Sequence, residues 1–114
     1  PAGCQPGRYK LGEQEVDLTP QEKVVLAGTD RLAGSALRMD RGVENLMKLA
    51  GLSLRDAVTM ATKNPARVGR IASRQRGLAP GDRGDIVQFR FDLERKAITV
   101  ERTWMAGEAV YAKG

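Results

Sequence analysis

Apolar and polar residues alternate in the first thirty residues of the chain, a pattern typical of β-strands. The segments RYKLG and EVDLT each place two apolar residues two positions apart, and Gly12 separates them as part of a turn. A third apolar run, KVVLAG, follows and ends at Gly28. The pattern therefore predicts a β-hairpin region over residues 8–27, including a short third strand, and then a loop over residues 29–35.

The spacing of apolar residues changes to three and four in residues 36–71, which predicts helices there. Gly51 supplies the C-terminal stop of a first helix. The apolar face of this helix consists of Met39, Val43, Leu46, Met47 and Ala50. Ser53 followed by Asp56 resembles a capping box and predicts a second helix, whose apolar face repeats the same spacing.

A third, short helix is predicted around the NPA segment. Pro65 disfavours the helical conformation at Asn64 and is expected to end the second helix there. Asn64 can then cap a new helix with Pro65 in its first position, and Gly69 can close it.

Residues 81–114 return to the alternation of β-strands. The alternating apolar residues are Val87, Phe89 and Phe91 in one run and Ile98, Val100 and Trp104 in the next. Gly107 turns the chain into a last strand, EAVY, as a terminal hairpin. The order of strands, helices and strands is not a repeating βαβ pattern, so the predicted fold class of this piece is α+β.

Charge adds one feature to this picture. The 114 residues carry a net charge of +5, and the segment from Lys63 to Arg76 contains five basic residues and no acid. Such a run can attract phosphates or nucleic acid, but it is also typical of a solvated face.

The two helices and this basic run can also be interpreted as a small helix-turn-helix DNA-binding module. That interpretation predicts DNA binding that weakens steeply with salt. The second helix would expose Arg55, Asp56, Thr59 and Thr62, which is not a base-reading set, and aromatic residues are sparse. We therefore expect no nucleic-acid partner and keep the module as an alternative.

The composition excludes several kinds of catalytic site. The chain has no histidine and one cysteine, Cys4, so imidazole and clustered thiolate ligands for a metal are absent, and a nucleophile would lack a histidine base. A single cysteine is compatible with a reducing cytoplasm. No apolar run approaches the roughly 18 residues of a membrane span, so we expect a soluble, cytoplasmic protein without a membrane partner.

Three segments carry a resemblance to a known family: LAGSALRMDRGVENLMKLAGLSLRDAVTMATKNPARVGRI, then GLAPGDRGDIVQF, then TWMAGEAVY. Together they resemble the C-terminal part of N-acetylglucosamine-6-phosphate deacetylases of the amidohydrolase superfamily. The NPA segment at Asn64 to Ala66 is shared widely in that superfamily, whereas LAGSALRMDRGV is the narrower signal. The resemblance covers essentially the whole chain.

This resemblance implies a C-terminal fragment of a metal-dependent (β/α)8 barrel with strands of a small β-sandwich domain. Residues 1–80 would be the end of the catalytic barrel, and residues 81–114 the C-terminal strands of the β-domain. The family's divalent metal, zinc or similar, and its catalytic aspartate would be bound or supplied upstream of Pro1. The chain alone would then be inactive, with no catalytic and no metal-binding residues of its own.

The implied parent enzyme hydrolyses a linear amide, converting N-acetylglucosamine 6-phosphate to glucosamine 6-phosphate and acetate. An amidohydrolase acting on a different amide or cyclic amide is the nearer alternative. One family feature carries over by position, because the loop that contacts the sugar-phosphate substrate matches Leu32, Ala33 and Gly34. If the helices were cut from a barrel, their apolar faces would lack partners, so we expect a homo-oligomer.

Overall fold

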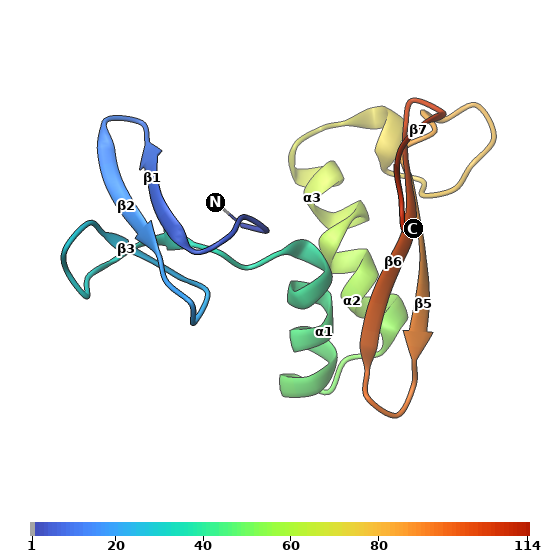
Figure 1. Cartoon of the computed structure of the whole chain (residues 1–114). Helices are drawn as coiled ribbons and strands as arrows, with labels where there is room; N and C mark the ends of the chain where they lie inside the picture. Colours follow the sequence, from blue (N-terminus) through green and yellow to red (C-terminus); the bar gives the residue numbers. More distant parts are fainter. Residues whose placement is uncertain (1) are drawn as a thin grey trace. The chain divides into compact units, whose positions relative to one another are not determined.

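The computed structural model describes residues 2–114, which divide into two compact units. The first unit ends at Arg38, and the second comprises Met39–Gly114 (Figure 1). Each unit has its own sheet and its own cluster of buried apolar side chains.

The first unit is a four-stranded antiparallel sheet in the order β1-β2-β3-β4. Its strands are β1 (Gly7–Leu11), β2 (Gln14–Leu18), β3 (Lys23–Leu26) and β4 (Leu32–Ser35). Alternation along β2 buries Val16 and Leu18 with Val24 of β3, as the sequence pattern predicts. The first three strands and the two-residue turn at Gly12, with φ of +61°, are thereby confirmed.

The predicted loop over residues 29–35 is only partly correct. Its second half is strand β4, which pairs with β3 and forms one edge of the sheet. The segment LAGS contains a glycine and no alternation of apolar residues, so it carries no local signal for a strand. Pairing with β3 supplies the order that the local sequence does not indicate.

The second unit packs helices against a three-stranded antiparallel sheet, β5-β6-β7 (Figure 1). Its helices are α1 (Met39–Leu49), α2 (Leu54–Ala61) and α3 (Lys63–Val68), followed by a 3₁₀ turn, η1 (Ala72–Arg74). Its strands are β5 (Ile86–Asp92), β6 (Ala97–Met105) and β7 (Glu108–Ala112). The observed α+β content agrees with the prediction from the pattern.

The apolar faces of α1 and α2 meet each other and the sheet. Val43, Met47 and Ala57 are buried, and Phe91 of β5 and Ile98 of β6 pack against them. The expectation that these helix faces have lost their partners is therefore wrong for the centre of the face. Met39, predicted to share this face, is instead 70% exposed at the first residue of α1.

Helix boundaries follow their caps, with one correction. Ser53 caps α2, because its hydroxyl accepts a hydrogen bond from the amide of Asp56 at 3.1 Å and donates to the Asp56 carboxylate at 2.7 Å. The third helix begins at Lys63 with Thr62 as its N-cap, so Pro65 lies in the third position and not the first. A proline fits there because amides of the first turn have no partner within the helix.

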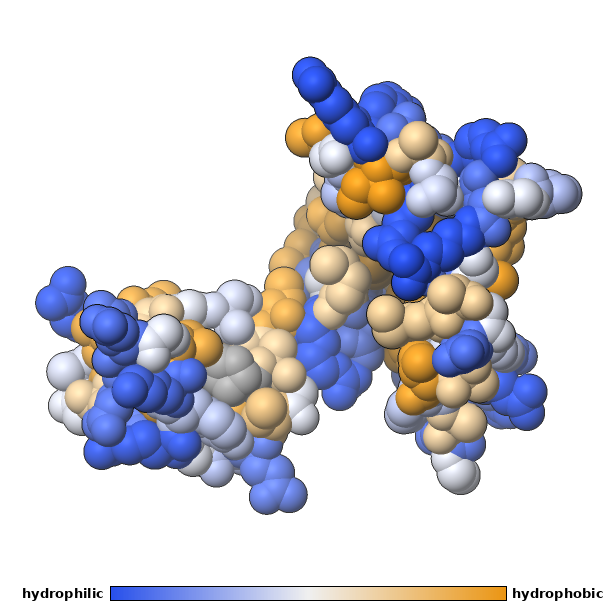
Figure 2. Space-filling view, turned by 90° about the horizontal axis from the view of Figure 1, so that it is seen from above, coloured by the Kyte–Doolittle hydropathy of each residue, from blue (hydrophilic) through white to orange (hydrophobic). Residues whose placement is uncertain are grey.

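The predicted boundary between residues 80 and 81 concerns the parent enzyme and stays a prediction. No helix within residues 2–114 combines the length and apolar character needed to cross a membrane. Figure 2 shows hydrophobic atoms interspersed with hydrophilic ones at the surface, and several large apolar side chains are exposed.

Candidate functional site

The three residues assigned to the substrate loop lie on the edge strand β4. Val24 of β3 pairs with Gly34, and Val25 pairs with Leu32, so Ala33 has no partner on β3 and forms a β-bulge. Bulges occur often beside active sites, because the extra residue turns its neighbours and leaves the ladder. Strand β4 pairs with β3 on one side only, so backbone groups at its other edge and at this bulge lie outside the ladder with β3.

The side chains of the three residues differ in their surroundings. Leu32 is 70% exposed, whereas Ala33 packs against the buried cluster of the first unit. A Cβ atom built on Gly34 would lie 3.6 Å from Val24 Cγ1 and 3.7 Å from Leu11 Cδ1, which are ordinary contacts. The fold thus has room for a small side chain at Gly34 and does not itself require glycine there.

The turn that leads into β4 is closed by its own hydrogen bonds. The amide of Leu26 donates to the carbonyl of Arg31 at 2.8 Å. The Thr29 hydroxyl donates to the Leu26 carbonyl at 3.0 Å and accepts from the Arg31 amide at 3.2 Å. These bonds fold the segment between β3 and β4 into a compact turn.

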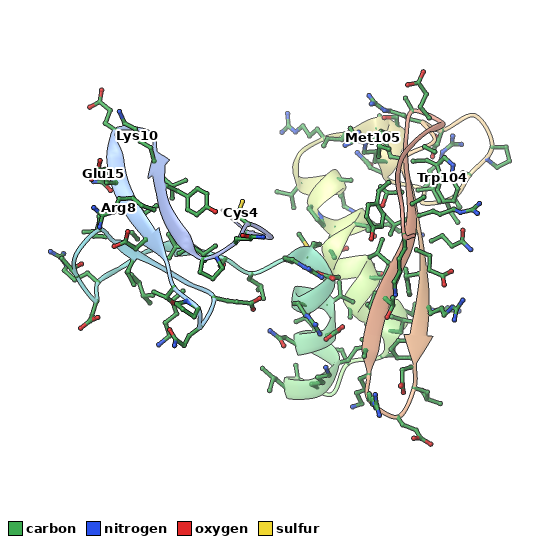
Figure 3. The ribbon with its side chains drawn as sticks, in the orientation of Figure 1. Cys4, Arg8, Lys10, Glu15, Trp104 and Met105 are labelled. Atoms are coloured by element: carbon green, nitrogen blue, oxygen red, sulfur yellow. The ribbon has the colours of Figure 1, made fainter. Side chains whose placement is uncertain are left out.

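A carboxylate on β2 also contacts this turn. Asp17 Oδ2 accepts a hydrogen bond from the Gly28 amide at 3.1 Å, and Arg8 Nε, directly opposite on β1, donates to Oδ1 at 2.8 Å. Figure 3 shows Arg8 and Glu15 on the two adjoining strands, where Arg8 also approaches Glu15 at 4.0 Å. The hydrogen bond from Arg8, followed by the one from Gly28, lowers the pKa of Asp17.

A second carboxylate, Glu44 of α1, was also missed by sequence reasoning. It is 1% exposed and accepts hydrogen bonds from the Ile98 amide at 2.8 Å, Arg41 Nη1 at 2.8 Å and Lys48 Nζ at 3.0 Å. Burial raises the pKa of Glu44, but these donors outweigh that effect, so the pKa lies below its ordinary value. Basic residues three before and four after Glu44 were the available signal.

The basic run of residues 63–76 is partly neutralised by acids of the following loop. Arg74 forms an ion pair with Asp85, and Arg76 Nη2 lies 2.5 Å from Asp82. For Arg67 and Arg70, no ion pair is found among residues 2–114. The run is therefore less basic in the fold than in the sequence.

Asp85 connects the loop between η1 and β5 to the β6–β7 turn by hydrogen bonds. It accepts hydrogen bonds from the Ala106 amide at 2.8 Å and from Arg83 Nε at 3.0 Å. The Ala106 amide is the largest influence that lowers the pKa of Asp85, and burial works against it. The Gly107 amide also donates to the Gly84 carbonyl at 2.9 Å, so the loop and the turn are joined at two points.

Three polar side chains of α2 and its C-cap form hydrogen bonds within the helical segment. Thr59 donates its hydroxyl to the carbonyl of Arg55 at 2.8 Å, and Thr62 donates to the carbonyl of Val58 at 2.6 Å. Asp56 is part of the cap described above. The hydroxyl donors of Thr59 and Thr62 are therefore already used by backbone carbonyls.

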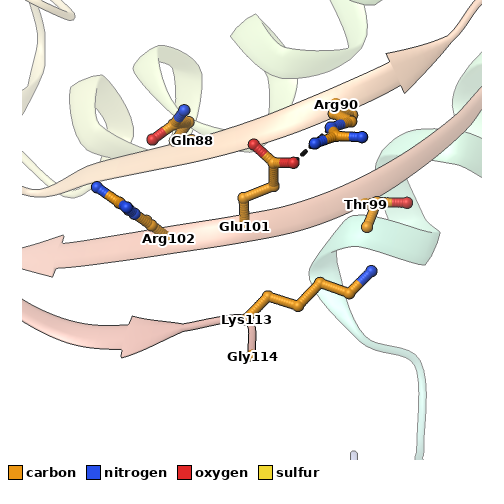
Figure 4. Close-up of a pocket in the computed structure, with 7 residues that line it drawn as sticks. All are labelled: Gln88, Arg90, Thr99, Glu101, Arg102, Lys113 and Gly114. Atoms are coloured by element: carbon orange, nitrogen blue, oxygen red, sulfur yellow. Dashed lines mark ion pairs between the residues drawn. The ribbon is translucent and has the colours of Figure 1, made fainter.

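A shallow polar hollow of about 660 Å³ lies over the three-stranded sheet (Figure 4). It is lined by Gln88, Arg90, Thr99, Glu101, Arg102, Lys113 and Gly114. Arg90 Nε forms an ion pair with Glu101 at 2.5 Å across the hollow. The side chain of Arg90 remains largely exposed, so this hollow is an open polar surface and not an enclosed site.

The described residues do not fit the metal that the resemblance implies. Within residues 2–114, no group of three or more potential ligands from His, Cys, Asp and Glu comes together. Cys4 is exposed (Figure 3), and the chain has no histidine. A metal centre would therefore need ligands from outside these residues.

Comparison with known proteins gives consistent results, although no family model matches the chain. An N-acetylglucosamine-6-phosphate deacetylase of Danio rerio is 32% identical over 97% of this chain and 26% of its own length. An N-acetylgalactosamine-6-phosphate deacetylase of Escherichia coli O157:H7 is 33% identical over 94% of this chain and 26% of its own length. The chain thus spans about a quarter of the length of these relatives.

Solved structures agree with the sequence relatives. A mutant N-acetyl-D-glucosamine-6-phosphate deacetylase from Mycobacterium smegmatis, in complex with N-acetyl-D-glucosamine-6-phosphate, matches with a TM-score of 0.71 and 32% identity. The match covers 96% of this chain and 28% of that one. By sequence and by fold, about 96% of the chain is similar to a C-terminal part of N-acetylglucosamine-6-phosphate deacetylases.

Proposed function

We propose that this chain is the C-terminal part of a hydrolase that converts N-acetylglucosamine 6-phosphate to glucosamine 6-phosphate and acetate. The observation that carries the proposal is the match to deacetylases of this substrate along nearly the whole chain, in sequence and in fold. The parent enzyme would be a cytoplasmic, metal-dependent amidohydrolase with a barrel and a small β-domain.

The relatives of this chain include deacetylases named for two different amino sugars. A relative that acts on the galactosamine epimer is as similar to this chain as those that act on the glucosamine form. Both substrates are N-acetylhexosamine 6-phosphates. The proposed reaction is therefore the chemistry that both share, hydrolysis of the N-acetyl group of an amino-sugar phosphate. The specific substrate that we propose is the glucosamine epimer.

Within this function, the chain contributes a wall of the substrate site and not the reacting groups. The bulge at Ala33 leaves backbone groups of β4 outside the ladder with β3. Small residues at Ala33 and Gly34 let a sugar or acetyl group approach that backbone closely. Because the described residues do not form a metal site, we assign no chemical step of the hydrolysis to them.

A chimeric enzyme tests the proposal. The matching C-terminal segment of the M. smegmatis deacetylase is replaced by residues 1–114 of this chain. Acetate release is then measured with N-acetylglucosamine 6-phosphate and with its galactosamine epimer. A truncated enzyme that lacks the segment and the isolated 114-residue chain serve as controls, and circular dichroism establishes that each protein is folded.

The proposal predicts acetate release by the chimera, faster with the glucosamine substrate, and none by the isolated chain. A folded chimera that hydrolyses neither sugar phosphate would overturn it. If the chimera hydrolysed the galactosamine epimer alone, the proposed sugar would be wrong and the proposed reaction, removal of the N-acetyl group, would stand. Acetate release by the isolated chain would show that the reacting groups lie within these 114 residues.

A further inference from the structure

The turn that leads into β4 is joined to β2 at two points, by a backbone hydrogen bond from the Ala27 amide to the Glu15 carbonyl at 3.1 Å and by the side chain of Asp17. The Gly28 amide donates to Asp17 Oδ2 at 3.1 Å, and β4 begins four residues later at Leu32. Gly28 has a φ of +73°, a left-handed conformation that glycine adopts without strain. Of the two bonds to β2, the one from Gly28 lies nearer to β4 and is the only one of the two made by a side chain, so a substitution at Asp17 can remove it.

The carboxylate is itself held in a fixed plane. Arg8 lies directly opposite Asp17 and donates Nε to Oδ1 at 2.8 Å and Nη2 to Oδ2 at 3.2 Å. Two parallel bonds of this kind fix the orientation of a carboxylate as well as its distance. Asp17 is thus oriented by β1 and presents Oδ2 to the turn.

The turn behaves as one body because its own hydrogen bonds close it. Leu26, Thr29 and Arg31 are joined by four hydrogen bonds of 2.8–3.2 Å. A displacement at Gly28 would therefore be transmitted to Arg31, the residue before β4. The bulge at Ala33 lies two residues further along.

We propose that Asp17 is a positioning residue, which holds the Gly28 amide and thereby sets the place of the substrate-contacting bulge at Ala33. Arg8 acts through Asp17 by orienting its carboxylate. The inference rests on the proposed function, because the substrate contact at Leu32, Ala33 and Gly34 belongs to that proposal. The link between Asp17 and the turn can be tested without any activity.

Hydrogen exchange of the full chain tests that link by NMR. Asp17→Ala should lower the protection of the Gly28 amide about tenfold, because a bond to a charged acceptor is lost. Asp17→Asn should retain part of the protection, since the amide oxygen can still accept. Glu15→Ala is the matched control, because Glu15 lies on the same strand near Arg8 and its side chain makes no bond to the turn. Unchanged Gly28 protection in Asp17→Ala would overturn the proposal.

Steady-state kinetics of the chimera tests the link to substrate. Asp17→Ala should raise the KM about tenfold, with a change in kcat of about twofold or less, because a displaced binding wall weakens substrate binding before it affects the reacting groups. The KM of Asp17→Asn should lie between those of Asp17→Ala and the unchanged chimera. The KM of Glu15→Ala should equal that of the unchanged chimera. A merely structural Asp17 would lower the melting temperature and leave the KM unchanged.

The outcomes separate the two proposals. An unchanged KM together with lost Gly28 protection overturns the positioning role and leaves the proposed function standing. A folded but inactive parent chimera overturns the proposed function, and the substrate half of this inference with it. If Asp17→Ala fails to fold, Asp17→Asn with a folded spectrum decides both measurements.

Discussion

At the scale of single residues, Glu44 is held by partners from its own helix and from the sheet of the second unit. It is buried and accepts three hydrogen bonds, from Arg41 and Lys48 of its own helix and from the Ile98 amide of β6. Lys96 adds a further link from the β5–β6 turn, because its Nζ donates to the Met47 carbonyl at 3.1 Å. A buried carboxylate without such donors would be strongly destabilising, so these partners explain why it is tolerated.

Replacing Glu44 tests this account through its pH dependence. The folded-state pKa is lowered from its ordinary value of 4.5, so the unfolded chain takes up the proton first as the pH falls. The stabilisation is therefore fully present above about pH 4.5 and is lost as the pH falls through the folded pKa. Glu44→Gln should lower the free energy of unfolding at pH 7 by about 2 kcal/mol. It should also remove the part of the fall in stability at acid pH that comes from protonation of Glu44.

Urea denaturation at a series of pH values from about 3 to about 7, which lie on both sides of the ordinary value of 4.5, measures both effects. Glu94→Gln is the control, because Glu94 is an exposed carboxylate of the β5–β6 turn. Equal curves for the two variants would contradict the role given to Glu44.

Gly34 offers a test that separates substrate contact from fold. Because a Cβ atom there meets only ordinary contacts, Gly34→Ala should leave stability unchanged or raise it by about 0.5 kcal/mol. In the chimera it should raise the KM about tenfold, because the proposed function has the substrate approach the backbone of β4 closely, and a side chain at Gly34 limits that approach. Gly12→Ala provides the contrast. Its φ of +61° predicts a loss of about 1 kcal/mol in stability with no change in KM.

At the scale of elements, the caps decide where the helices begin and end. Gly51, with φ of +69°, allows the Leu52 amide to return to the Leu46 carbonyl at 3.3 Å after α1. Ser53 then opens α2 with its hydroxyl on the Asp56 amide. These residues were recognised from the sequence because capping depends on contacts within a few positions.

The Ser53 cap has a measurable consequence. Ser53→Ala removes the acceptor for the Asp56 amide and should lower the free energy of unfolding by about 1 kcal/mol. Thermal and urea unfolding of the full chain provide the measurement. Ser73→Ala in the 3₁₀ turn is the matched control, because Ser73 is exposed and does not precede a capped helix. If Ser53→Ala lowered the free energy of unfolding no more than Ser73→Ala does, the capping role of Ser53 would be contradicted.

At the scale of the whole molecule, each unit buries a small apolar cluster and leaves large apolar side chains exposed. Leu49, Val68 and Leu78 are more than four-fifths exposed, and all three belong to the helical segment or the loop after it. Self-association therefore stays a prediction. We now attribute it to these exposed side chains, because the centres of the helix faces are already packed. Single exposed apolar residues are common, whereas several in one segment favour association.

Light scattering over a range of concentrations measures the association state. We expect a dimer or a larger assembly of the 114-residue chain at high concentration. Val68→Glu should shift the equilibrium toward the monomer, because a charge cannot be buried there without a partner. Leu93→Glu, in the β5–β6 turn, is an exposed apolar control of similar exposure. A monomeric mass at every concentration would contradict the prediction.

The sequence by itself determined most of the element types, most strand positions, and the caps at Gly51 and Ser53. These depend on periodicity and on contacts between near neighbours, which the linear order contains. Only the tertiary structure decided that residues 32–35 pair as β4 with a bulge, because strand pairing depends on β3 and not on the local segment. It also brought Asp17 to Gly28 and Glu44 to Ile98, since hydrogen bonds between residues 11 and 54 positions apart exist only once the chain has folded.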